Sequence, residues 1–195
     1  MAVQMIIEVP GMTLEQYERL NELMTIHGDE DEPDGLISHV AGSTGDGVLV
    51  ADVWESQEQL DRFYAERLGP ALAEAGVPEV PPQLLPVHNL IPRGGGERAG
   101  VIVLLELDGF GTDTYDALTA QMDAHTGDPS KHPAFSHAAS KSEHGLVVVD
   151  VWESPEAFGR FAEGELGPAA AQAGHDLSGA QPRVVPVHYR LTGKS

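Results

Sequence analysis

The pentapeptide DVWES occupies residues 52–56 and occurs again at residues 150–154. In both places an apolar run precedes it, GVLVA in the first copy and GLVVV in the second. Runs of this kind favour a β-strand. Ser56 and Ser154 are good N-cap residues, and an acidic residue follows each of them in what would be the first helical turn. The pentapeptide therefore predicts, twice, a strand that ends where a helix begins.

The copying extends far beyond these five residues. A shift of 98 positions aligns residues 3–76 with residues 101–174 without a gap, and 27 of these 74 pairs are identical. Self-similarity of this length indicates a tandem duplication. We predict one repeat over residues 1–94, a glycine-rich linker over residues 95–100 and a second repeat over residues 101–195.

Each repeat has the pattern of a β-α-β-β-α-β unit. An apolar first strand is followed by a helical period in which Tyr17, Leu20, Met24 and His27 share one face. Two further strands, a helix ending at Gly76 and a last strand after a proline-rich segment complete the order. We expect Gly69-Pro70 to interrupt the second helix. The order predicts an α+β fold of two ferredoxin-like repeats with strand order 4-1-3-2, packed sheet to sheet as an internal pseudo-dimer.

Composition limits the partners. A net charge of −20 disfavours nucleic acid and anionic membrane surfaces, and no apolar run approaches the ~18 residues of a membrane span. The absence of cysteine excludes disulfides and thiolate sites, and no basic leader precedes an apolar signal region. We expect a cytoplasmic protein whose partner is a small molecule. Further homodimerisation is left open.

The stretch VVVDVWESPEAFGRFAEGELGPAAAQAG, with a last strand after a proline, resembles the dimeric α+β barrel superfamily and its antibiotic-biosynthesis-monooxygenase-like (ABM) group. The resemblance covers both repeats. It implies a dimeric α+β barrel with a ligand pocket between sheet and helices or at the barrel centre. Members include cofactor-independent monooxygenases of polycyclic aromatic substrates, haem-degrading oxygenases, cyclases, isomerases and proteins without an assigned activity, so the resemblance selects no reaction.

Histidines give the strongest chemical signal. His27, His39 and His88 recur at the matching positions of the second repeat as His125, His137 and His188. Histidine is suited to proton transfer near neutral pH and is the commonest metal ligand. Of these six residues, we predict His39, His88, His137 and His188 to be catalytic.

Strand alternation adds carboxylates to this set. Leu49, Ala51 and Val53 form an apolar face that suits packing against helices, so we expect Asp52 and its copy Asp150 to point into the space between the sheets. The same argument places Glu8 and Glu106 there. Two interpretations remain open: a proton-transfer pocket with catalytic Asp52 and Asp150, or a divalent-metal site. The metal sets would be His39, His88, Glu8 and Asp52, and His137, His188, Glu106 and Asp150.

A third interpretation is structural, because a buried His–carboxylate pair also satisfies polar groups in a core. The predicted substrate-binding residues have the same ambiguity: Tyr17, Tyr115, Trp54 and Trp152 suit an aromatic ligand or a packed core, and His27 and His125 suit a ligand or a helix C-terminus.

These patterns leave three functions. The first is an enzyme that oxidises or isomerises an apolar, aromatic or polyketide-like substrate through histidine acid–base groups, with no cofactor predicted. The second is a haem- or divalent-metal-dependent oxygenase of the same fold. The third is a non-catalytic ligand-binding or stress-associated protein.

Overall fold

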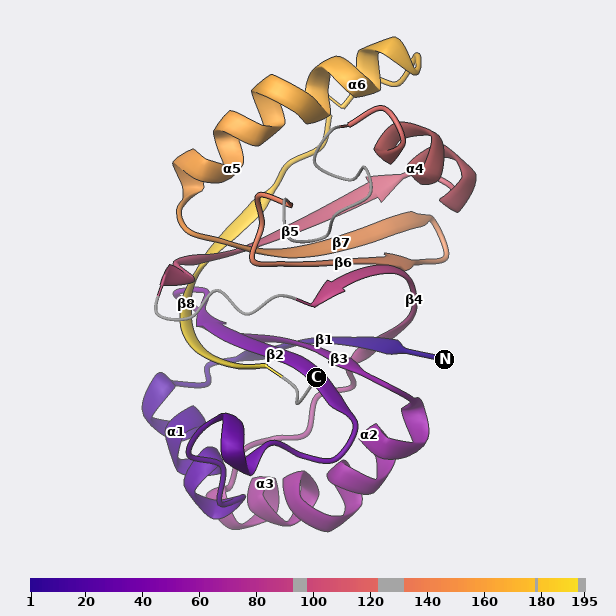
Figure 1. Ribbon diagram of the computed structural model, residues 1–195. Helices are drawn as coiled ribbons and strands as arrows, with labels where there is room; N and C mark the ends of the chain where they lie inside the picture. The colour runs from indigo at the N-terminus through magenta and orange to yellow at the C-terminus, as the bar shows by residue number, and fades with distance from the viewer. Residues whose placement is uncertain (93–97, 123–131, 178, 193–195) are drawn as a thin grey trace. The chain divides into compact units, whose positions relative to one another are not determined.

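The computed structural model describes residues 1–92, 98–122, 132–177 and 179–192 (Figure 1). The first repeat has the predicted β-α-β-β-α-β order. Its elements are β1 (Val3–Pro10), α1 (Leu14–Leu23), the 3₁₀ turn η1 (Asp29–Asp31), β2 (Leu36–Ser43), β3 (Gly47–Trp54), α2 (Gln57–Phe63), the π-helical turn η2 (Tyr64–Leu68), α3 (Gly69–Ala75) and β4 (Gln83–Pro92).

The second repeat follows the same order. Its elements are β5 (Val101–Asp108), α4 (Thr112–Thr119), β6 (Ser136–Lys141), β7 (Gly145–Trp152), α5 (Pro155–Phe161), the π-helical turn η6 (Ala162–Leu166), α6 (Gly167–Gln172) and β8 (Arg183–Thr192). The boundary predicted from DVWES is confirmed in both repeats. The Ser56 and Ser154 hydroxyls accept hydrogen bonds from the third residue of the helix that follows.

Hydrogen bonds join the strands in the order β1-β3-β2-β8-β5-β7-β6-β4, and this order closes into a barrel. Within the first repeat the order is 4-1-3-2, as predicted. The register matters for the side chains discussed below: His39 lies directly opposite Asp52, and His137 lies directly opposite Asp150. Side chains of directly opposed residues point to the same face of a sheet.

Contacts divide the chain into two compact units, and these do not coincide with the sequence repeats. Unit 1 comprises Met1–Pro86 with Val185–Ser195, and unit 2 comprises Val87–Val184. In unit 1 the end of β8 pairs with β2, and in unit 2 the end of β4 pairs with β6. Each repeat thus contributes the end of its last strand to the unit built by the other repeat.

The second helix of each repeat continues through the Gly-Pro step that we expected to interrupt it. Pro70 has no backbone N–H, so a regular α-helical hydrogen bond cannot form there. The chain adopts a π-helical turn in front of this step instead, in which the Gly69 N–H bonds to the carbonyl of Tyr64, and Gly167 bonds to Ala162 in the same way. The helix ends at Gly76, which has the left-handed conformation that glycine tolerates best.

Helices cover one face of the sheet in each unit: α1, α2 and α3 in unit 1, and α4, α5 and α6 in unit 2 (Figure 1). In unit 1 this face of β3 carries Val48, Val50 and Trp54, which pack against Leu20 and Leu60 of the helices. Alternation therefore turns Asp52 toward the helices as well. Leu49, Ala51 and Val53 are buried on the opposite face.

The predicted orientation of Asp52 and Asp150 was therefore wrong. Both faces of β3 are apolar, so an apolar triplet could not identify the face that packs on the helices. The carboxylates lie in the core between helices and sheet, where hydrogen bonds compensate for their burial.

Candidate active site

Three side chains of unit 1 form a continuous hydrogen-bonded chain between α1 and the sheet. The Tyr17 hydroxyl lies 2.6 Å from Nε2 of His39, and Nδ1 of His39 lies 2.6 Å from Oδ1 of Asp52. The second carboxylate oxygen of Asp52 accepts a bond of 3.4 Å from the indole N–H of Trp54. We call Tyr17, His39 and Asp52 the unit 1 relay.

Local structure explains why these residues meet. Asp52 and Trp54 are two positions apart on β3, so they share a face, and His39 is opposite Asp52 in register. Tyr17 lies on the buried face of α1, one turn before Leu20, and is 4% exposed. The relay thus arises from strand alternation, strand register and helical period together.

Hydrogen-bond chemistry fixes the direction of the chain. An ionised carboxylate only accepts, so Asp52 receives the Nδ1–H of His39 and the indole N–H of Trp54. When the imidazole of His39 is neutral, its Nε2 has a free lone pair, which accepts the hydroxyl proton of Tyr17. Burial raises the pKa of Tyr17; a hydrogen bond from Asn21 opposes this, and the negative charge of Asp52 adds to it. Tyr17 is accordingly a neutral donor at neutral pH.

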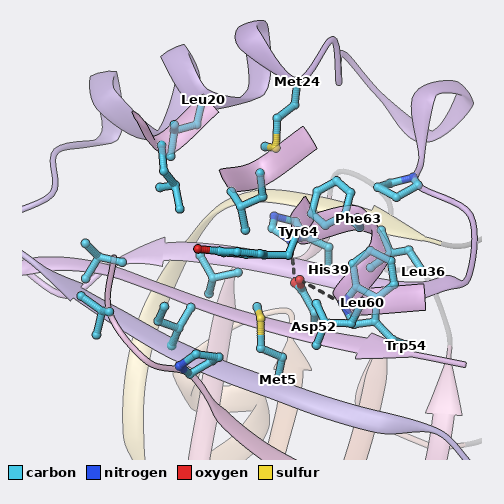
Figure 2. Close-up of a pocket in the computed structure, with 18 of the residues that line it drawn as sticks. Met5, Leu20, Met24, Leu36, His39, Asp52, Trp54, Leu60, Phe63 and Tyr64 are labelled. Carbon is cyan, nitrogen blue, oxygen red and sulfur yellow. Dashed lines mark hydrogen bonds and ion pairs between the residues drawn. The ribbon is translucent and has the colours of Figure 1, made fainter. Parts of the chain in front are cut away.

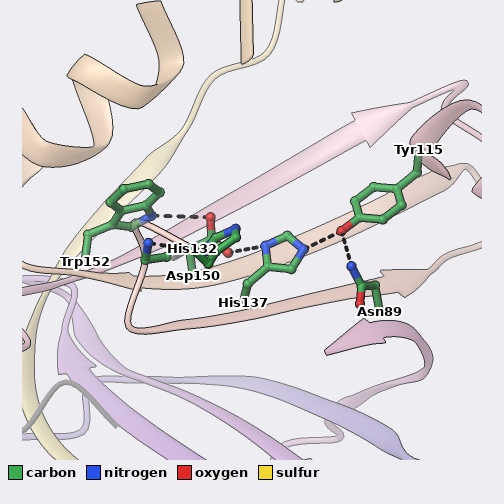
Figure 3. Close-up of polar contacts among 7 residues, drawn as sticks. Asn89, Tyr115, His132, His137, Asp150 and Trp152 are labelled. Carbon is green, nitrogen blue, oxygen red and sulfur yellow. Dashed lines mark hydrogen bonds and ion pairs between the residues drawn. The ribbon is translucent and has the colours of Figure 1, made fainter. Parts of the chain in front are cut away.

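Unit 2 contains the same chain at the duplicated positions (Figure 3). The Tyr115 hydroxyl lies 2.6 Å from Nε2 of His137, whose Nδ1 lies 2.7 Å from Asp150, and Trp152 donates to Asp150 at 3.3 Å. We call Tyr115, His137 and Asp150 the unit 2 relay. Burial raises the pKa of Tyr115 too, and a hydrogen bond from Asn89 opposes it. Of the predicted catalytic residues, the structure therefore pairs His39 with Asp52 and His137 with Asp150.

A cavity of about 530 Å³ lies against the unit 1 relay. Figure 2 shows apolar side chains of α1, α2 and the sheet arranged around this space, with His39 and Asp52 in its wall. Its volume is within the range of small-molecule sites. The predicted substrate-binding residues Tyr17 and Trp54 both line it. Representative apolar lining residues are Met5, Leu20, Met24, Leu60 and Phe63.

A histidine occupies the corresponding position beside the unit 2 relay. The His132 ring is 3% exposed, and its centroid lies 5.2 Å from His137, 6.5 Å from Trp152 and 6.2 Å from Phe161. The counterparts of these three neighbours in the first repeat are His39, Trp54 and Phe63, all of which line the unit 1 cavity. Among the described residues, His132 thus lies where the equivalent side chains of unit 1 border a cavity.

His88, on β4 of the first repeat, lies in unit 2, and His188, on β8 of the second repeat, lies in unit 1. His88 is bonded to Asp116 at 2.7 Å and lies edge-on to Tyr115, and His188 is bonded to Glu18 at 3.1 Å and lies edge-on to Tyr17. Each histidine contacts the ring of a relay tyrosine. Their predicted catalytic role stays a prediction, and in this arrangement they help to position the tyrosines.

The predicted metal sets are not assembled. Glu8 is opposite Leu49 in register and Glu106 is opposite Val147, so both carboxylates lie on the face away from the helices. His39 and Asp52 lie on the helix side, and His88 belongs to the other unit. The expected convergence does not occur because Asp52 was assigned to the wrong face of β3.

A metal or haem iron needs a ring nitrogen with a free lone pair. Both ring nitrogens of His39 and of His137 already have partners within their relays. Within the described residues, no group of three His, Asp or Glu side chains is arranged to hold a metal ion. The relays therefore do not fit a metal or haem ligand set.

The remaining predicted substrate-binding residues differ in outcome. His27 lies beyond α1, which ends at Leu23, and it is exposed and does not line the cavity. The helical period was extended one turn too far. His125 lies outside the described residues. Tyr115 and Trp152 are buried in the unit 2 core, and the ring of Trp152 lies 6.5 Å from that of His132.

Sequence reasoning missed the residues that distinguish the two relays. Asn89 donates to the Tyr115 hydroxyl at 2.9 Å, whereas the matching position in unit 1 is Tyr189, whose ring lies 6.0 Å from that of Tyr17. His132 was set aside because it has no histidine counterpart. A search for positions that differ next to duplicated histidines would have found both.

Comparisons with known proteins agree with the architecture. A structure from Lactobacillus acidophilus NCFM described as a "putative monooxygenase" aligns with a TM-score of 0.66 at 10% identity, covering 98% of this chain and 96% of its own. A second one so described, from Fusobacterium nucleatum, has a TM-score of 0.66 at 4% identity, covering 96% and 91%. The chain has the dimeric α+β barrel fold. The fold class predicted from the sequence is thereby confirmed.

An anthrone oxidase-like protein also shares this fold, with a TM-score of 0.53 at 17% identity and coverage of 97% of this chain and 92% of its own. No protein-family model matches the sequence. No curated protein matches it either. Among the described helices, none is both long and apolar enough to cross a membrane.

Proposed function

We propose that this protein is an oxygenase-type enzyme that removes a proton from an apolar aromatic or polyketide-like molecule bound in the unit 1 cavity. The observation that carries the proposal is the position of the unit 1 relay in the wall of an apolar cavity. A neutral histidine held by a carboxylate is a suitable proton acceptor, and the surrounding apolar side chains suit a polycyclic ligand.

In the proposed first step, an acidic C–H or O–H of the substrate gives its proton to the Tyr17 oxygen while Tyr17 passes its own proton to Nε2 of His39. His39 becomes an imidazolium that Asp52 stabilises by charge. Tyr17 has the same proton count before and after the transfer. Its raised pKa is compatible with this role, because no free phenolate has to form.

The substrate anion then reacts with dioxygen. For a methylene group next to an aromatic ketone, the anion and dioxygen form a peroxide that takes up one proton. The peroxide loses water and leaves a carbonyl group. One methylene and one dioxygen are thus converted into one carbonyl and one water. The structures named as monooxygenases and as anthrone oxidase-like support oxidation over isomerisation, in which the proton would only move to another carbon.

Anthrone, a tricyclic ketone with one acidic methylene group, is a direct test substrate. We expect the protein to accelerate its conversion to anthraquinone, with one dioxygen consumed per quinone formed, as followed by an oxygen electrode and by absorbance. Removal of dioxygen should stop quinone formation. A rate equal to the protein-free rate for anthrone and its hydroxylated analogues would contradict the proposal.

A further inference from the structure

The ionisable residues that line the unit 1 cavity are unbalanced in charge. Three carboxylates, Asp52, Asp61 and Glu79, take part in the lining, whereas none of the lining residues is lysine or arginine. Asp52 is deep in the wall and is compensated by His39 and Trp54. Asp61 and Glu79 are exposed, so they form an acidic rim around an apolar interior.

The rim has a definite structure. Asp61 belongs to α2, and Glu79 follows α3 in a segment whose prolines Pro78 and Pro81 restrict the backbone. A hydrogen bond with Glu79 raises the pKa of Tyr64, which is on η2 and also lines the cavity. Glu79 and Tyr64 thus both belong to the exposed part of the cavity lining.

Two of these three rim residues have no counterpart of the same type in the second repeat. The position of Asp61 is Gly159 in the second repeat, and the position of Tyr64 is Ala162. Asp61 and Tyr64 of the rim therefore border the unit 1 cavity, and the second repeat has no ionisable residue at either position. This association indicates that the rim belongs to the ligand site and does not merely reflect the acidity of the whole chain.

An anionic ligand would be penalised twice in such a cavity. It would lose hydration on entering an apolar interior that no lysine or arginine lines, because Arg67 is engaged with the Met24 carbonyl and the Phe63 ring, and it would be repelled by the carboxylates at the entrance. A neutral ligand has neither penalty. We propose that the acidic rim makes the unit 1 cavity selective against anions, so that the ligand is an uncharged polycyclic phenol or ketone rather than a carboxylic or sulfonic acid.

This inference deepens the proposed function and rests on it only in taking the ligand as the substrate. Binding can be tested without turnover, using two fluorescent probes that differ by one charged group. N-phenyl-1-naphthylamine is neutral, and 1-anilinonaphthalene-8-sulfonate is the same skeleton with a sulfonate. Both are small enough for a cavity of about 530 Å³. We expect the neutral probe to bind at least about tenfold more tightly at low salt.

The charge effect is assigned by paired variants. Asp61→Asn with Glu79→Gln should tighten sulfonate binding about three- to tenfold and leave the neutral probe within about twofold, because only electrostatic repulsion is removed. Glu143→Gln with Glu163→Gln changes the net charge equally on exposed positions of unit 2 and should alter neither affinity. Leu20→Trp, which fills the cavity, should abolish neutral-probe binding and so locate it.

Three results would overturn the inference: equal affinity of the two probes, an affinity ratio that the rim variant leaves unchanged, or no binding of the neutral probe to the wild type. Failure here is distinguishable from failure of the proposed function. Oxidation of anthrone together with equal probe affinities would refute the charge selectivity alone. Selective probe binding without any oxidation would refute the enzymatic proposal alone.

Discussion

Unit 1 and unit 2 contain the same relay but differ in what surrounds it. The tyrosine, histidine, aspartate and tryptophan recur with hydrogen-bond lengths that agree within 0.1 Å. In unit 1 the relay faces a cavity, and in unit 2 it is packed against His132 and bonded to Asn89. We therefore propose that the chemistry belongs to unit 1 and that the unit 2 relay has a structural role.

The largest expected effect breaks the equivalence of the two histidines. His39→Asn should lower kcat/KM for anthrone oxidation by about 10²–10⁴, because the proton acceptor is removed. His137→Asn is the matched control and should change kcat/KM less than about threefold, since it does not face the cavity. Equal losses in both variants would show that the units work together. Kinetics should be measured on variants whose circular dichroism matches that of the wild type.

Opening unit 2 sharpens the comparison. His132→Ala removes a buried ring between Trp152 and Phe161, which should cost about 1–3 kcal/mol of unfolding free energy and leave a new cavity. The number of neutral-probe sites, measured by titration, should rise from one to two. A variant that keeps a single site would mean that the unit 2 core closes over the space.

Loss of a relay hydroxyl should separate stability from activity. Tyr115→Phe leaves His137 and Asn89 without their shared partner in a buried site, which should cost about 1–3 kcal/mol. Tyr17→Phe should cost about 1 kcal/mol, because water in the cavity can replace the hydroxyl. Only the latter should lower kcat. Thermal unfolding and steady-state kinetics of the pair measure both effects.

The smallest effect is a dependence of stability on alkaline pH. Burial raises the pKa of Tyr17 and of Tyr115 above the ordinary value of 10.0. The folded state then holds these protons more tightly than the unfolded state, so the stabilisation is complete below pH 10 and declines as pH rises above it. Urea unfolding at pH 9 and at pH 11 should show a smaller decline in the Tyr17→Phe, Tyr115→Phe double variant than in the wild type. An identical decline would contradict the assignment.

The sequence predicted the fold well because its signals are local and repeated. The apolar runs, the N-cap serines and Gly76 defined the element order, and the duplication confirmed each element by its copy. Strand order 4-1-3-2 followed from that order. The exchange of the ends of β4 and β8 could not be predicted, because pairing with β6 or β2 depends on how the two repeats assemble.

The site was predicted in part. His39, Asp52, Tyr17 and Trp54 were all selected. His39 and Asp52 were expected in one site and do lie together, whereas the contact of Tyr17 with His39 was not foreseen. Apolar residues on both faces of β3 concealed which face packs on the helices. The choice of face decided whether Asp52 was expected near Glu8 or near Tyr17. The role of His132 depends on which side chains pack around it in the folded core. The pattern of residue types along the chain does not predict that packing.

The central claim is that the unit 1 relay takes a proton from a bound aromatic substrate, and hydrogen exchange measures this step without dioxygen. Anthrone is incubated anaerobically in D₂O with the wild type, His39→Asn or His137→Asn, and deuterium uptake at its methylene carbon is followed by NMR. We expect deuterium uptake well above the protein-free rate for the wild type and for His137→Asn. In His39→Asn this acceleration should be lost. Wild-type exchange at the protein-free rate, or undiminished exchange in His39→Asn, would contradict the central claim.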